Sequence, residues 1–193
     1  GFFRFRWNDE TKYIVKILIS MIPVLIIGLF FSEEVEYLFS GNLVFVGLML
    51  LVTATLLFIT YYSKSKNKPI SNKNAFIIGI AQAFAVIPGI SRSGATIATG
   101  LLLGNKKENV ARFSFLMVLI PIIGANVKDY LEGDMSSNAD VSFSVLIIGF
   151  IAAFISGLLA CKWMIGIVKR GKLIWFSIYC FIVGTVAIVY GLI

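Results

Sequence analysis

The segment "PGISRSGAT", residues 88–96, concentrates polar groups inside a long apolar stretch of the chain. Arg92 carries the only charge between Lys73 and Lys106, and three hydroxyl side chains lie close to it in sequence: Ser91, Ser93 and Thr96. A guanidinium offers a planar fork of donors that suits phosphate or carboxylate. Gly94 lets backbone approach a ligand, and a helix starting here would add free N–H groups at its positive end. The segment therefore predicts a binding site for a phosphate-like anion.

Other interpretations of the same residues remain open. Ser91 and Thr96 are also the residue types that cap helix ends, and Arg92 could pair structurally with an acidic residue or with backbone carbonyls. The sequence "GISRS", residues 89–93, partly matches the nucleophile-elbow motif G-x-S-x-G. Ser93 stands where the second glycine should be, and the chain has no histidine to activate a serine, so this hydrolase motif is excluded.

The composition indicates a membrane protein, because 59% of the 193 residues are hydrophobic and only 14% are charged. The net charge of +7 comes from basic residues placed between apolar runs, which argues against a nucleic-acid partner. The absence of histidine excludes a Ser-His-Asp triad and the commonest zinc ligands. Cys161 and Cys180 lie within apolar runs, so neither a disulfide nor a metal cluster is expected.

Five apolar runs are long enough to cross a bilayer, which needs about 20 residues of helix. They cover residues 13–31, 43–62, 110–130, 142–168 and 172–193. We therefore expect an all-α integral membrane protein with about five transmembrane helices.

A sixth apolar region, residues 75–104, is broken in the middle by Pro88-Gly89 and by the segment around Arg92. The loops on both of its sides are basic, and basic loops remain in the cytoplasm. A single crossing would place one of these loops outside, so the region is predicted to be a re-entrant helix pair with its turn at residues 88–94. Non-helical backbone at membrane depth must be buried in protein or line a watery cavity.

Broken helices of this kind suggest an inverted-repeat fold, in which a second re-entrant pair enters from the opposite face. The sequence contains no internal copy of the motif, and it begins at Gly1 without a methionine. We therefore expect residues 1–193 to form a single transmembrane domain that is a fragment of a longer protein, with residues 75–104 as its active-site hairpin.

The nine residues "PGISRSGAT" resemble the P-G-x-S-R-S-G-x-T signature of the undecaprenyl-diphosphate phosphatase family, the bacitracin-resistance proteins. The following "ARFSFLMVLIPIIGA", residues 111–125, is similar to the next helix of that family. The resemblance implies a membrane enzyme that hydrolyses undecaprenyl diphosphate to undecaprenyl phosphate and inorganic phosphate, which recycles the lipid carrier for bacterial cell-wall synthesis. It implies catalytic roles for Arg92, which would clamp the diphosphate, and for Ser91 and Ser93, which would contact it, while Thr96 supports the loop.

The chain departs from the family at its other signature, a glutamate-rich motif of the form E-G-x-x-E-F-L-P-V-S-S-T-G-H. This motif is absent from the sequence and is expected to precede residue 1. Gln82 takes the place of one of its glutamates in the second repeat, and its amide can bind phosphate but cannot act as a base. A divalent metal, Mg²⁺ or Ca²⁺, is possible with the missing carboxylates, whereas no metal site is expected in this chain. The fragment alone is therefore predicted to be inactive.

A transporter or flippase of a phosphorylated isoprenoid lipid is the alternative, because broken helices with an anion-binding N-terminus also occur in secondary transporters. The expected partners are an isoprenoid diphosphate lipid and the membrane, with a homo-oligomer possible. The resemblance implies a multi-pass protein of the bacterial inner membrane whose active site faces the outer side.

Overall fold

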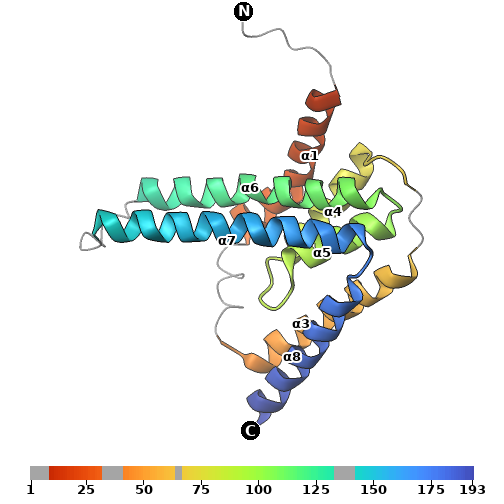
Figure 1. Ribbon diagram of the computed structural model, residues 1–193, viewed down its shortest axis with the longest axis vertical. Helices are drawn as coiled ribbons and strands as arrows, with labels where there is room; N and C mark the ends of the chain where they lie inside the picture. The colour runs from red at the N-terminus through yellow and green to blue at the C-terminus, as the bar shows by residue number, and fades with distance from the viewer. Residues whose placement is uncertain (1–8, 32–40, 64–66, 133–141) are drawn as a thin grey trace, which may run out of the picture.

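The computed structural model describes residues 9–31, 41–63, 67–132 and 142–193 (Figure 1). All its regular elements are helices, and five are long and apolar enough to cross a membrane. These are α1 (Asp9–Phe30), α3 (Leu43–Tyr62), α6 (Lys107–Glu132), α7 (Phe143–Lys169) and α8 (Ile174–Leu192). The all-α fold and the five predicted spans are confirmed.

Two helices begin earlier than the predicted apolar runs, because charged residues form their first turns. α1 begins at Asp9 and α6 at Lys107, so that Asp9, Glu10 and Glu108 occupy first turns. Carboxylates stabilise that position because they face the positive end of the helix dipole. The sequence expectation started both runs at the first apolar residue and therefore set these boundaries three or four residues too late.

The broken region forms two short helices, α4 (Asn72–Phe84) and α5 (Arg92–Leu102). With 13 and 11 residues they are about 20 Å and 17 Å long, which is less than the bilayer thickness. Backbone hydrogen bonds join the two outer ends, from Lys68 N to Gly104 O (3.3 Å) and from Lys106 N to Lys68 O (3.0 Å). The pair thus returns to the side from which it starts, as predicted for a re-entrant hairpin. A second, inverted hairpin stays a prediction.

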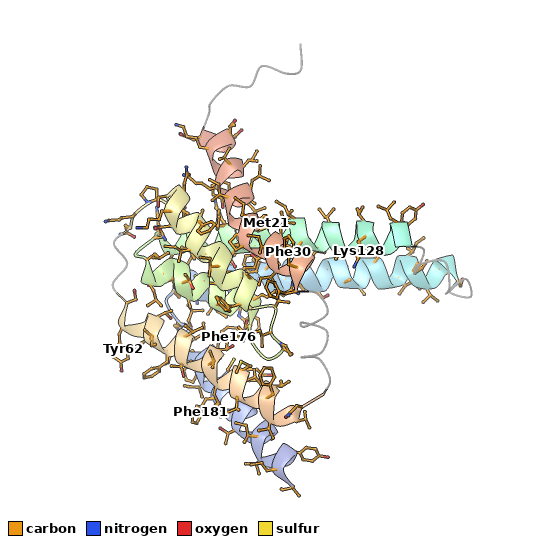
Figure 2. The ribbon with its side chains drawn as sticks, turned by 180° about the vertical axis from the view of Figure 1, so that it is seen from behind. Met21, Phe30, Tyr62, Lys128, Phe176 and Phe181 are labelled. Carbon is orange, nitrogen blue, oxygen red and sulfur yellow. The ribbon has the colours of Figure 1, made fainter. Side chains whose placement is uncertain are left out.

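α1 packs directly against the first helix of this hairpin. A Cβ atom at Gly79 of α4 would lie 2.2 Å from the backbone oxygen of Ser20 in α1, so only glycine permits this approach. The core below the contact combines Met21, Ile78 and Phe113 from α1, α4 and α6. Phe176, near the start of α8, packs against the same core, and Figure 2 labels both Met21 and Phe176.

Two further helix pairs complete the fold (Figure 1). α3 and α8 lie side by side, with Gly47 and Gly184 at their crossing and a hydrogen bond from Ser177 Oγ to Ala54 O (2.6 Å). α6 and α7 run together and project away from the other helices, and Figure 2 shows Lys128 on the projecting part. The apolar side chains of this part are largely exposed, which is the surface expected toward lipid.

The basic loops meet at one end of the molecule. Ser63, after α3, donates a hydrogen bond to Leu101 O (3.2 Å), and Lys169, at the end of α7, pairs with Glu108 at the start of α6 (3.6 Å). The ends of the hairpin lie in the same region through the Lys68 bonds. This arrangement agrees with the predicted placement of these loops on one side of the membrane.

The Gly79 contact predicts that Gly79→Ala separates α1 from α4 and destabilises the protein by about 2 kcal/mol, because the new methyl group meets backbone that cannot rotate away. Thermal unfolding in detergent measures the effect. Gly149→Ala on α7 is the matched control, since a Cβ there meets nothing within 4 Å. Equal midpoints for the two variants would contradict the packing.

Candidate functional site

The break between α4 and α5 is held by a hydroxyl group of α3. Thr53 Oγ1 accepts a hydrogen bond from Ser91 N (3.1 Å) and is within donor distance of Gly89 O (3.3 Å). Gly89 has a φ of +91°, and a Cβ there would lie 2.5 Å from Val46 O of α3. The turn requires glycine for both reasons, and the Thr53 hydroxyl satisfies the backbone N–H of Ser91 within the protein.

Ser91 is the N-cap of α5. Its Oγ accepts from Gly94 N at 3.1 Å, and a Cβ at Gly94 would lie 2.9 Å from that oxygen. The capping interpretation therefore describes the Ser91 hydroxyl, and Gly94 makes room for the cap. Neither residue lines the cavity described next, and their catalytic and substrate-binding roles stay predictions.

A cavity of about 230 Å³ opens beside the first turn of α5. Four of the six predicted site residues meet there, with three residues from α6; the lining consists of Gln82, Arg92, Ser93, Thr96, Ser114, Phe115 and Val118. α4 thus provides an amide, α5 a guanidinium and two hydroxyls, and α6 a third hydroxyl and two apolar side chains. Residues over 30 positions apart in sequence form one polar pocket with an apolar wall.

Thr96 joins α5 to α6. Its hydroxyl lies 2.9 Å from Arg92 O in its own helix and 2.5 Å from Ser114 Oγ, and both side chains are buried. Ser114 was not among the predicted site residues. The available signal was that Ser114 is the only serine or threonine within the apolar run 110–130. The contact places the Thr96 side chain against α6, and the roles of Thr96 in substrate binding and in supporting the loop stay predictions.

Arg92 is exposed, and it forms no ion pair or side-chain hydrogen bond with the residues that the structure describes. As the first residue of α5, it also contributes a backbone N–H that helical geometry leaves unpaired, and so does Ser93. Gln82 is 2% exposed, and its Oε1 is buried without a hydrogen-bond partner in the described part of the chain. A buried amide oxygen without a partner costs about 1–3 kcal/mol. Because that oxygen only accepts hydrogen bonds, the part of Gln82 that can bind an anion is its NH₂ group.

The electrostatics of the lining favour an anion over a cation. The lining contains one permanent positive charge and no carboxylate, and the helix dipole adds to that positive charge. Among residues 9–31, 41–63, 67–132 and 142–193, no three His, Cys, Asp or Glu side chains form a group that could hold a metal. The oxygens present are neutral and lie beside a guanidinium, so these residues by themselves do not fit Mg²⁺ or Ca²⁺.

Comparison with known proteins gives the context of this site. Residues 2–186 match the family described as bacitracin resistance protein BacA. The chain belongs to this family. The resemblance drawn from "PGISRSGAT" is thereby confirmed, and the BacA-family chain is a multi-pass membrane protein with five apolar spans in the part that the structure describes.

Relatives resemble the chain over nearly its whole length. It is 56% identical over 192 residues to a protein of Christiangramia forsetii named undecaprenyl-diphosphatase. The match covers 99% of this chain and 72% of the relative. The chain is 58% identical to a protein of the same name in Bacteroides fragilis, again over 72% of the relative. A protein of that name in Methanobrevibacter smithii is 38% identical over 93% of the chain and 66% of its own length.

The Thr96–Ser114 contact predicts energetic coupling between α5 and α6. Thr96→Val and Ser114→Ala should each lower the free energy of unfolding. The double variant should lose about 1 kcal/mol less than the sum of the two single losses, because both substitutions remove the same hydrogen bond. A double-mutant cycle of thermal unfolding in detergent measures this coupling. Additive losses would show that the two hydroxyls do not interact.

Proposed function

We propose that the protein is an undecaprenyl-diphosphatase that releases inorganic phosphate from undecaprenyl diphosphate and leaves undecaprenyl phosphate. The observation that carries the proposal is the Arg92 guanidinium at the start of α5, which has no ion-pair partner among the described residues and lines the same cavity as Gln82, whose amide NH₂ can donate. Identities of 56–58% to two proteins named undecaprenyl-diphosphatase support the same reaction. The protein is accordingly a hydrolase of the membrane.

The cavity can bind the diphosphate through several donors at once. Arg92 faces two phosphate oxygens with a planar fork, and the first N–H groups of α5 add donors along the helix dipole. The hydroxyl of Ser93 and the amide of Gln82 lie on the same lining and complete the set. Hydrolysis transfers a phosphoryl group to water and concentrates negative charge on the phosphate oxygens, so these donors stabilise the transition state.

The reaction also needs a base that takes a proton from the attacking water while the bond between the phosphorus and the bridging oxygen breaks. The described lining holds no carboxylate and no imidazole, so its residues cannot take that proton near neutral pH. The expected source is the glutamate-rich motif of the family, which stays a prediction, as does any Mg²⁺ or Ca²⁺ held with it. The role of the described residues is to bind, orient and neutralise the diphosphate.

The lipid part of the substrate fits the surroundings of the cavity. Phe115 and Val118 form its apolar wall on α6, and exposed apolar side chains of α6 continue from there. The basic loops at one end of the molecule indicate the cytoplasmic side of the inner membrane. The hairpin enters from that side, and we propose that the cavity at its tip opens toward the outer side, where the isoprenoid diphosphate would enter.

Arg92 provides the most direct functional test. Arg92→Gln should lower kcat/KM for undecaprenyl diphosphate by about 10²- to 10³-fold, and Arg92→Lys should retain part of the activity, because lysine keeps the charge but loses the fork. Phosphate release in detergent measures both, in a purified protein that also carries the predicted glutamate-rich motif. Lys73→Gln, an exposed cation on α4 outside the cavity, should stay within about twofold of the parent.

Two results would contradict the proposal. The first is unchanged phosphate release by Arg92→Gln. The second is transfer of labelled undecaprenyl diphosphate across vesicles without phosphate release by the parent protein, which would favour the transporter alternative.

A substitution of Gln82 can distinguish a role of its amide in ligand binding from a role in folding. Gln82→Leu keeps the approximate size of the side chain and removes a buried amide whose oxygen has no partner among the described residues. It should therefore leave the unfolding midpoint unchanged or raise it, while KM for the diphosphate rises by about tenfold. Loss of stability together with unchanged KM would show that the amide serves the fold instead of the ligand.

A further inference from the structure

A second cavity lies at the junction of α7 and α8. It has a volume of about 500 Å³ and lies around the last turns of α7 and the turn into α8. Its lining includes Lys162, Trp163, Gly166, Ile167, Arg170 and Lys172. None of these residues belongs to the phosphate cavity beside α5.

The turn after α7 fixes two of these cations. Lys172 N donates to Ile167 O (3.1 Å), and Gly171 N donates to Val168 O (3.0 Å). This is the Schellman pattern, which requires a left-handed residue after the cap, and Gly171 supplies it with a φ of +67°. Arg170 and Lys172 therefore stand on either side of a rigid turn and do not depend on a flexible loop.

Along α7, Lys162, Gly166 and Arg170 follow each other at intervals of four residues and so share one face of the helix. Gly166 lies between the two cations, and a Cβ there would meet nothing within 4 Å. The missing side chain therefore leaves a hollow between Lys162 and Arg170, and no neighbouring helix fills it.

The charges around this hollow are not neutralised within the described part of the chain. Lys169, one residue before the cap, pairs with Glu108 at 3.6 Å. In contrast, Lys162, Arg170 and Lys172 form no ion pair with any described residue, and the lining contains no acidic side chain. Lys162 and Arg170 are eight residues apart, about 12 Å along the axis, and both side chains are long enough to reach toward an anion that lies between them.

An apolar groove continues from the cationic hollow. It has a volume of about 390 Å³ and is lined by Trp163, Ile167, Trp175, Phe176 and Tyr179. Trp163 and Ile167 line both cavities, so the two are adjacent. Trp163 is 74% and Trp175 68% exposed, which is the arrangement of tryptophans at a membrane–water interface.

We propose that this site binds an anionic glycerophospholipid of the cytoplasmic leaflet. Its phosphate would occupy the hollow between Lys162, Arg170 and Lys172, and the first part of an acyl chain would lie in the aromatic groove. Lys162 is seven residues before the end of α7, about 10 Å along the axis, so its ammonium reaches the headgroup level from within the span. The inference does not depend on the enzymatic activity proposed above, because the site shares no residue with that cavity.

Tryptophan fluorescence can test the proposal directly. In a Trp7→Phe background, Trp163 and Trp175 are the only tryptophans, and both line the groove. The protein is reconstituted in vesicles of phosphatidylcholine that contain a small fraction of phosphatidylglycerol with brominated acyl chains. Brominated phosphatidylglycerol should quench the emission at a lower mole fraction than brominated phosphatidylcholine, by about tenfold or more.

Three variants locate the binding. Lys162→Gln and Arg170→Gln should each reduce the preference for phosphatidylglycerol by about fivefold. Gly166→Leu fills the hollow, should abolish the preference, and should fold normally because the site has open space. Gly157→Leu, also open to space on α7 but outside the cavity, should change nothing.

Three outcomes would overturn the proposal. They are equal quenching by the two brominated lipids, an unchanged preference in a folded Gly166→Leu variant, and displacement of phosphatidylglycerol by an equal mole fraction of undecaprenyl phosphate. The last result would assign the site to the isoprenoid lipid. Unfolding midpoints of all variants, measured in parallel, separate loss of binding from loss of structure.

Discussion

Backbone that leaves the helix at membrane depth needs partners for its N–H and C=O groups, and this requirement governs the α4–α5 hairpin. The Thr53 hydroxyl of α3 supplies an acceptor for Ser91 N and lies 3.3 Å from Gly89 O. The close approach of α3 in turn requires glycine at position 89. Each unsatisfied group in hydrocarbon would cost several kcal/mol, so the break is stable only because α3 is packed against it.

The same break produces the chemistry of the site. A helix that begins inside the protein presents its first N–H groups and its dipole to whatever lies in front of it. Ser91 caps one of these groups, through Gly94 N, and leaves those of Arg92 and Ser93 beside the cavity. Gln82 reaches the cavity from α4, and the Thr96–Ser114 contact fixes the wall made by α6. The contacts that satisfy the backbone groups of the turn therefore also orient the groups that donate hydrogen bonds to the anion.

Much of the fold follows from the sequence, because hydrophobic length and loop charge are strong constraints in a membrane. The apolar run 43–62 coincides with α3, and the basic loops on both sides of residues 75–104 predicted the hairpin whose ends the structure joins through Lys68. The cluster of Arg92 with Gln82, Ser93 and Thr96 was likewise expected from residue types and from the family signature. These features depend on local composition or on a short contiguous motif.

Contacts between helices could not be predicted in the same way. Thr53 and Ser114 are single hydroxyls in apolar runs, and nothing in one sequence shows which helix face meets the hairpin. Ser91 could be a cap or a ligand on composition alone, and only the distance to Gly94 N shows that it is a cap. The hollow at Gly166 depends on the neighbours of α7, which the sequence leaves undefined.

The central claim is that the start of α5 binds the diphosphate. A structure of the purified protein with a methylene-bridged, non-hydrolysable analogue of undecaprenyl diphosphate tests it most directly. The account predicts the two phosphonate groups between the Arg92 guanidinium, the first N–H groups of α5 and the Gln82 amide, with the isoprenoid chain leaving along α6. An analogue whose phosphonates lie elsewhere, with this cavity empty, would contradict it.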